Sequence, residues 1–169
     1  MSRAPVAGSL RGVAKHLWLL RHGEAVPHGS TSDADRELTP KGERQARNAG
    51  RALAKLDREF DGCYASPRVR ARDTARLACE ALGVEVHEVD VLSGGFERSD
   101  AEELLRAHGD GACILVVGHE PDFSQVVHDF TGGRVDFKKG GIAAVRVSGA
   151  VAEQTVLLRP AELEAMAGS

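Results

Sequence analysis

Short apolar runs recur along the chain and predict buried strands. The runs at 17–20 and 113–117 are continuously apolar, as in strands that are covered on both faces. A shorter run at 62–65 predicts another strand, and alternation of apolar and polar residues at 84–89 predicts a half-buried one. Near the end of the chain, β-rich segments at 142–147 and 154–158 flank the turn sequence Ser148-Gly149-Ala150 and predict a hairpin.

Amphipathic segments lie between these strands and predict helices. Thr39 can cap a helix that has Pro40 at its first position, and a stripe of alanines over 69–82 predicts a second helix that Gly83 ends. A short acidic helix is expected over 99–108 and another from Pro121 to about 131, whereas 27–37 is a polar loop. Strands alternating with helices predict an α/β fold, a three-layer α/β/α sandwich with a mainly parallel central sheet.

Length and composition fit one globular domain. The 169 residues are enough for one core, and we expect a flexible tail at 1–15 followed by a single domain at 16–169. The tail has no apolar stretch of signal-peptide length, and no run approaches a membrane span. A net charge of −3 and 4% aromatic residues argue against a nucleic-acid partner.

Cysteine usage and local charge refine this picture. The cysteines, Cys63, Cys79 and Cys113, lie among apolar neighbours without metal-ligand spacing, so we expect them to be reduced and the protein to be cytoplasmic. Between positions 36 and 76 there are 11 Lys and Arg against 6 Asp and Glu, while 77–112 holds 2 against 9. The basic segment favours an anion site, although two solvated helix faces would give the same counts.

Candidate chemistry follows three of the predicted strands. Arg21-His22-Gly23 comes directly after the first strand, and Gly118-His119-Glu120-Pro121 comes after the strand at 113–117. The segment Ser66-Pro67-Arg68-Val69-Arg70-Ala71 leads from the strand at 62–65 into a helix. Ligands of open α/β sheets bind at the carboxyl ends of the strands, so two histidines and at least two arginines are expected to meet there. Such a cluster suits phosphate.

These motifs resemble those of the histidine phosphatase superfamily, which includes phosphoglycerate mutases and acid phosphatases. The resemblance extends from about Leu17 to about Thr131 and implies a phosphoglycerate mutase-like fold. Within the superfamily, the chain is most similar to the small bacterial phosphohistidine phosphatases of the SixA type. Three features carry this similarity: the segment 33–42, the Ser66-Pro67-x-x-Arg70-Ala71-x-x-Thr74 stretch and the Gly118-His119-Glu120-Pro121 motif. The resemblance implies a hydrolase without a cofactor, and no metal-ligand pattern is visible.

The resemblance also implies roles for individual residues. His22 is the expected nucleophile, Arg21 and Arg70 clamp the phosphate, and His119 contacts it. Arg36 and Asp33 belong to the same pattern and are expected near the substrate together with Ser66. Arg68 and Arg72 are set aside because, on one helix with Arg70, they would point away from it. For each of these residues, ordinary packing or solvation remains the alternative reading.

The expected substrate is phosphohistidine on a partner protein, such as a histidine phosphotransfer domain of a phosphorelay. Only 48 residues separate Arg70 from His119, too few for the insertion that closes over small substrates in mutases. A general acid could come from Asp33, Glu97, Asp100 or Glu120, or be dispensable, because a leaving imidazole needs less protonation than an alkoxide. The alternatives are a broad phosphomonoesterase and a non-catalytic phosphate-binding module. Nothing in the sequence indicates the oligomeric state.

Overall fold

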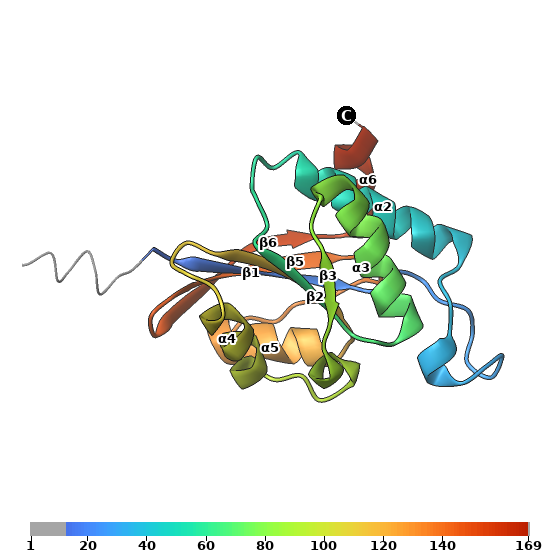
Figure 1. The fold of residues 1–169 in the computed structure, drawn as a ribbon, viewed down its shortest axis with the longest axis horizontal. Coiled ribbons are helices and arrows are strands. Elements are labelled where there is room, and N and C mark those ends of the chain that lie inside the picture. Colours follow the sequence, from blue (N-terminus) through green and yellow to red (C-terminus); the bar gives the residue numbers. More distant parts are fainter. Residues whose placement is uncertain (1–12, 169) are drawn as a thin grey trace, which may run out of the picture.

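A computed structural model describes residues 13–168 and shows a six-stranded sheet with helices on both faces (Figure 1). The strands are β1 (Lys15–Arg21), β2 (Gly62–Ala65), β3 (Val86–Glu88), β4 (Cys113–Gly118), β5 (Ile142–Ser148) and β6 (Val151–Leu158). Their order in the sheet is β3-β2-β4-β1-β5-β6. The first four strands in this order run parallel to one another, and β5 pairs antiparallel with both β1 and β6, which confirms the predicted mainly parallel sheet.

The helices form the two outer layers. They are α2 (Pro40–Ala54), α3 (Val69–Leu82), α4 (Arg98–Arg106), α5 (Asp122–Thr131) and α6 (Pro160–Gly168), with short 3-10 helices η1 (Asp33–Asp35) and η2 (Asp90–Ser93). Alternate residues of β1 explain the layering: Trp18 and Leu20 join the core under α2, α3 and α6, while Leu17 and Leu19 join the core under α4 and α5. The three-layer α/β/α architecture is therefore confirmed (Figure 1).

Several predicted boundaries agree closely with the structure. The strand at 62–65 and the helix at 69–82 have the predicted ends, and Gly83 ends that helix in the left-handed conformation at φ 66°. Thr39 caps α2, since its Oγ1 accepts a hydrogen bond from the Gly42 N–H at 3.1 Å. The helix expected from Pro121 begins at Asp122, with Pro121 at the capping position.

Other boundaries differ from the prediction. The strand expected over 84–89 is only β3, a three-residue edge strand, because the chain turns into η2 at Asp90. The helix α6 was not predicted; Leu163 is its one buried residue, so its sequence carries a weak amphipathic signal. The predicted tail at 1–15 lies mostly outside the described residues, and β1 already begins at Lys15. Within residues 13–168, no helix is both long and apolar enough to cross a membrane.

Candidate active site

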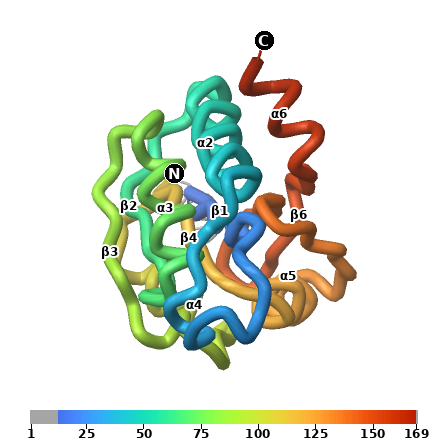
Figure 2. The backbone as a smooth tube through the Cα atoms, turned by 90° about the vertical axis from the view of Figure 1, so that its right-hand side faces the viewer, coloured from blue at the N-terminus to red at the C-terminus, as the bar shows by residue number. Residues whose placement is uncertain are grey.

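The candidate site lies at the carboxyl ends of three adjacent strands, which Figure 2 views end-on. Because β2, β4 and β1 are neighbours in the sheet, the residues that follow them meet although they are far apart in sequence. The His22 N–H donates to the Gly118 carbonyl at 3.1 Å, and the Ser66 N–H donates to the Val117 carbonyl at 3.0 Å. These bonds continue the strand pairing by one residue and hold the backbones of His22 and Ser66 against the end of β4, directly before His119.

The two histidines form the centre of the site. Both imidazoles are buried, and their ring centroids lie 5.2 Å apart. His22 Nδ1 lies 2.7 Å from the Gly23 carbonyl oxygen. A carbonyl can only accept, so Nδ1 carries the proton and Nε2 keeps its lone pair. Burial lowers the pKa of His22 to about 3, and the nearby His119, Arg70 and Arg21 add to this effect. The hydrogen bond to the Gly23 carbonyl acts in the opposite direction and raises the pKa. The ring is neutral at pH 7 and can act as a nucleophile through Nε2.

Contacts from α3 hold the loop that carries His22. The Gly23 N–H donates to Thr74 Oγ1 at 3.0 Å, and that hydroxyl donates to the Arg70 carbonyl at 2.6 Å. Thr74 is fully buried. It was noted in the sequence only as part of a motif, and the structure shows that it ties the His22 loop to the helix that presents Arg70.

The arginines of the site are only partly satisfied by the protein. Arg21 donates from Nη1 to the Phe137 carbonyl at 2.8 Å, and Arg70 donates from Nη1 to the Asp33 carbonyl at 2.7 Å. Within residues 13–168, four buried side-chain nitrogens have no hydrogen-bond partner, and three of them belong to the predicted site: Arg21 Nε, Arg70 Nε and His119 Nδ1. Buried donors are normally paired, so this concentration points to an anionic ligand that would accept from them.

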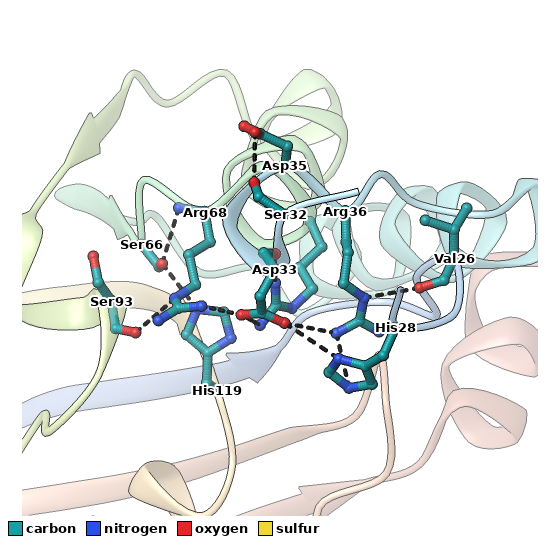
Figure 3. Close-up of polar contacts among 11 residues, drawn as sticks. Val26, His28, Ser32, Asp33, Asp35, Arg36, Ser66, Arg68, Ser93 and His119 are labelled. Atoms are coloured by element: carbon teal, nitrogen blue, oxygen red, sulfur yellow. Dashed lines mark hydrogen bonds and ion pairs between the residues drawn. The ribbon is translucent and has the colours of Figure 1, made fainter. Parts of the chain in front are cut away.

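Asp33, in η1, contacts three guanidinium groups through one carboxylate, and Figure 3 shows those of Arg36 and Arg68 beside it. Arg36 Nη1 lies 3.0 Å from Oδ1 and Arg70 Nη2 lies 3.2 Å from Oδ2, which also contacts Arg68. The hydrogen bond from Arg36, followed by the charges of Arg70 and Arg68, lowers the pKa of Asp33 to about 2. The carboxylate is thus ionised at neutral pH and has no proton to give to a leaving group.

Arg68 lies within the candidate site, although its place in the sequence predicts a side chain that points away from Arg70. It was assigned to the same helix as Arg70, but it is the capping residue of α3 and has extended backbone angles, φ −61° and ψ 134°. A helical wheel does not apply to it, and its side chain reaches Asp33 and donates to the Ser93 carbonyl at 2.8 Å (Figure 3). Arg72, by contrast, pairs with its neighbour Asp73.

The other predicted residues take supporting positions. Arg36 is buried; it donates from Nε to the Val26 carbonyl at 2.9 Å and joins the site through Asp33. Ser66 was expected near the substrate, but its side chain is fully buried and its Oγ lies 2.8 Å from His119 Nε2. The structure therefore places Ser66 next to His119, with none of its side chain exposed to solvent.

The remaining candidate acids cap helices. Asp100 accepts from the Glu97 N–H at 2.8 Å in a capping box at the start of α4, and Glu120 Oε1 accepts from the Ser124 N–H at 2.8 Å in the first turn of α5. In the part of the chain that the structure describes, no group of three or more His, Cys, Asp or Glu side chains is arranged to hold a metal ion. The site's positive charge comes from arginine.

Comparison with known proteins places this geometry in a family. The family model of the histidine phosphatase superfamily (branch 1) matches residues 17–94. An uncharacterized protein from Picosynechococcus is 33% identical over 141 residues, which cover 77% of this chain and 84% of that protein. The mitochondrial serine/threonine-protein phosphatase Pgam5 of Drosophila yakuba is 34% identical over 127 residues, which cover 73% of this chain but 38% of that protein.

A solved structure has the same fold. The structure of the protein histidine phosphatase SixA complexed with tungstate matches with a TM-score of 0.79 at 22% sequence identity, covering 88% of this chain and 99% of that chain. This match confirms the predicted fold, and the family match includes Arg21, His22 and Arg70. With the sequence likeness to the Picosynechococcus protein extending over most of both chains, the protein belongs to the histidine phosphatase superfamily.

Proposed function

We propose that this phosphatase removes the phosphoryl group from a phosphohistidine of a partner protein, with His22 as the nucleophile. The observation that carries the proposal is the neutral His22 imidazole together with three buried nitrogens, Arg21 Nε, Arg70 Nε and His119 Nδ1, that have no hydrogen-bond partner within residues 13–168. A phosphoryl group offers several anionic oxygens to such donors. The arrangement suits binding and attack at one phosphorus atom.

The proposed reaction has two displacements. His22 Nε2 forms a bond to phosphorus while the bond between phosphorus and the substrate imidazole breaks, and the leaving nitrogen takes the electron pair and later a proton from water. Arg21 and Arg70 offset the charge on the phosphoryl oxygens in the transition state. Water then attacks the phosphorus of phospho-His22, which releases inorganic phosphate and returns the electron pair to Nε2.

Two features favour phosphohistidine over a small phosphate ester. The 48 residues between Arg70 and His119 form only the rest of α3 with β3, η2, α4 and β4, without a further covering layer. This connection holds no inserted segment that could close over a small substrate, which suits a phosphorylated side chain on another protein. Moreover, Asp33 is ionised and the other acids considered cap helices, so the site favours a leaving group that needs little protonation.

The comparisons support the same class of substrate. SixA, with a matching fold, is a protein histidine phosphatase, and Pgam5 is a serine/threonine-protein phosphatase. Both names describe phosphatases that act on proteins. A cytoplasmic location fits the proposal, because Cys63, Cys79 and Cys113 are buried free thiols.

The test is phosphate release from a phosphohistidine protein, a phosphoserine peptide and a panel of small phosphomonoesters. We expect the highest kcat/KM on phosphohistidine and loss of turnover in His22→Ala, while His87→Ala, which removes an exposed imidazole, keeps activity. Phosphoenzyme trapped from the wild type should resist alkali and decay in acid, as a phosphoramidate does. Faster turnover of a small ester would move the assignment to a metabolite phosphatase. Phosphate binding without any turnover would indicate a binding module.

A further inference from the structure

The buried hydroxyl of Ser66 makes two polar contacts, one with the backbone and one with His119. Its Oγ accepts a hydrogen bond from the Arg68 backbone N–H at 3.2 Å and lies 2.8 Å from His119 Nε2 (Figure 3). None of the side chain is exposed to solvent. The hydrogen bond from Arg68 uses one lone pair of the Ser66 oxygen. The hydroxyl proton of Ser66 still needs an acceptor. Among the contacts described for this hydroxyl, only Nε2 can accept that proton.

The direction of this bond decides where His119 carries its own proton. Burial, and then the charges of Arg70, Arg68 and Arg21, lower the pKa of His119 to about 4, so the ring is neutral at pH 7. A neutral imidazole has one proton on two nitrogens. If Nε2 accepts from Ser66, the proton resides on Nδ1. That nitrogen is buried and without a partner within residues 13–168.

We propose that Ser66 is a positioning residue that fixes His119 in the tautomer with a protonated Nδ1, so that His119 donates a hydrogen bond to the phosphoryl group. The proposal rests on the proposed function for the identity of the acceptor. In the opposite tautomer, a lone pair on Nδ1 would face anionic oxygen, and the Ser66 proton would be buried without an acceptor. Both changes are unfavourable, since buried polar groups are costly when unpaired.

Removal of the hydroxyl should change catalysis without removing any group that touches substrate. In Ser66→Ala, the two tautomers of His119 become closer in free energy, and part of the population presents a lone pair to the phosphoryl oxygen. We expect kcat/KM to fall roughly 10- to 100-fold, by analogy with removal of the partner that orients a metal-ligating histidine. Ser66→Thr keeps the hydroxyl and should recover part of the loss, and Ser99→Ala, at an exposed serine, should have no effect.

The decisive measurement is the tautomer itself, read from the imidazole nitrogens of ¹⁵N-labelled protein at neutral pH and assigned with His119→Gln. In the wild type we expect a pyrrole-type Nδ1 and a pyridine-type Nε2. In Ser66→Ala we expect averaging or reversal of the two signals. Addition of inorganic phosphate should shift the Nδ1–H proton of the wild type as it becomes hydrogen-bonded. Circular dichroism and urea unfolding show whether each variant is folded.

The outcomes separate this inference from the proposed function. A wild-type His119 protonated on Nε2 overturns the role of Ser66, whatever the enzyme hydrolyses. The expected tautomer in the wild type together with unchanged tautomer and kcat/KM in a folded Ser66→Ala also overturns it. If the nitrogens respond to the variant and to phosphate as expected but nothing is hydrolysed, the inference about Ser66 stands and the proposed function fails.

Discussion

Asp33 is the residue that organises the guanidinium groups of the site. Its carboxylate contacts Arg36, Arg68 and Arg70, and its backbone carbonyl accepts a further bond from Arg70. The carboxylate holds these three positively charged groups close together. It also places a negative charge near the region where a phosphoryl group would bind. Asp33 therefore has two opposing effects on an anionic ligand: it orders the arginines and it repels the ligand.

We expect the repulsion to dominate, so that Asp33→Asn tightens binding of inorganic phosphate. The amide has the shape of the carboxylate and keeps an oxygen acceptor for arginine, while its charge is lost. One unit charge at about 4 Å contributes about 1 kcal/mol in a water-like environment, which corresponds to roughly fivefold in Kd. Titration calorimetry at low salt measures the change, with Asp35→Asn, at an exposed carboxylate that pairs with Ser32, as the control. Weaker phosphate binding in Asp33→Asn would show that ordering of the arginines is the larger effect.

Among the elements, the N-terminal part of α2 and the loop after β1 approach each other through glycine. A Cβ added to Gly42 would lie 2.0 Å from the Glu24 carbonyl oxygen, and one added to Gly23 would lie 2.6 Å from the Gly42 oxygen. Farther along α2, a Cβ on Gly50 would lie 2.1 Å from the Ala78 oxygen of α3. The backbones of α2, α3 and the His22 loop are thus in direct contact. This contact fixes the position of His22 relative to Arg70, which α3 carries.

Gly42→Ala tests this close approach. In most helices, alanine at a glycine position stabilises by up to about 1 kcal/mol. Here the methyl group has no space, and we expect a loss of about 1–3 kcal/mol in the free energy of unfolding together with reduced kcat/KM as the loop shifts. Gly109→Ala, where an added Cβ meets nothing within 4 Å, should change neither quantity. Equal stabilities of the two variants in urea unfolding would contradict the packing that places the loop.

For the molecule as a whole, folding buries two histidines in their neutral form. His22 and His119 have pKa values lowered to about 3 and about 4, mainly by burial, from an ordinary value of 6.5. Below pH 6.5 the unfolded chain takes up protons that the folded chain does not bind, so acidification favours unfolding. The two residues that make the site reactive therefore limit the stability of the protein in acid.

The free energy of unfolding should accordingly fall as the pH is lowered from 7 to 5. Each histidine contributes about 2 kcal/mol to the decrease, because pH 5 is about 1.5 units below the unfolded pKa and one unit corresponds to about 1.4 kcal/mol. Urea unfolding at both pH values measures the slope. His22→Asn or His119→Asn should remove about half of this contribution, and His87→Asn, at an exposed position, should leave it in place. A slope that is the same in all four proteins would contradict the assigned neutral state.

The sequence by itself determined the elements whose signals are local. The apolar runs of β1 and β4 and the alanine stripe of α3 are buried on the faces that the pattern predicts, and Gly83 ends α3 because glycine adopts its left-handed conformation without strain. The alternation of strands and helices predicts that the strands run parallel, whereas their order in the sheet comes from the structure. Because the carboxyl ends of parallel strands lie at one edge, the sequence predicts that the motifs after β1, β2 and β4 meet there.

The tertiary structure alone decided the directions of side chains that leave irregular backbone, and the elements that depend on long-range packing. Arg68 and Ser66 lie between β2 and α3, where no periodicity applies, so their contacts with Asp33 and His119 could not be read from spacing. The helix α6 has one buried residue, Leu163, so its sequence pattern is too weak to predict a helix. In the structure, α6 packs against α2. Periodic sequence encodes which face is buried, whereas a site of converging polar groups depends on distances between segments that only folding brings together.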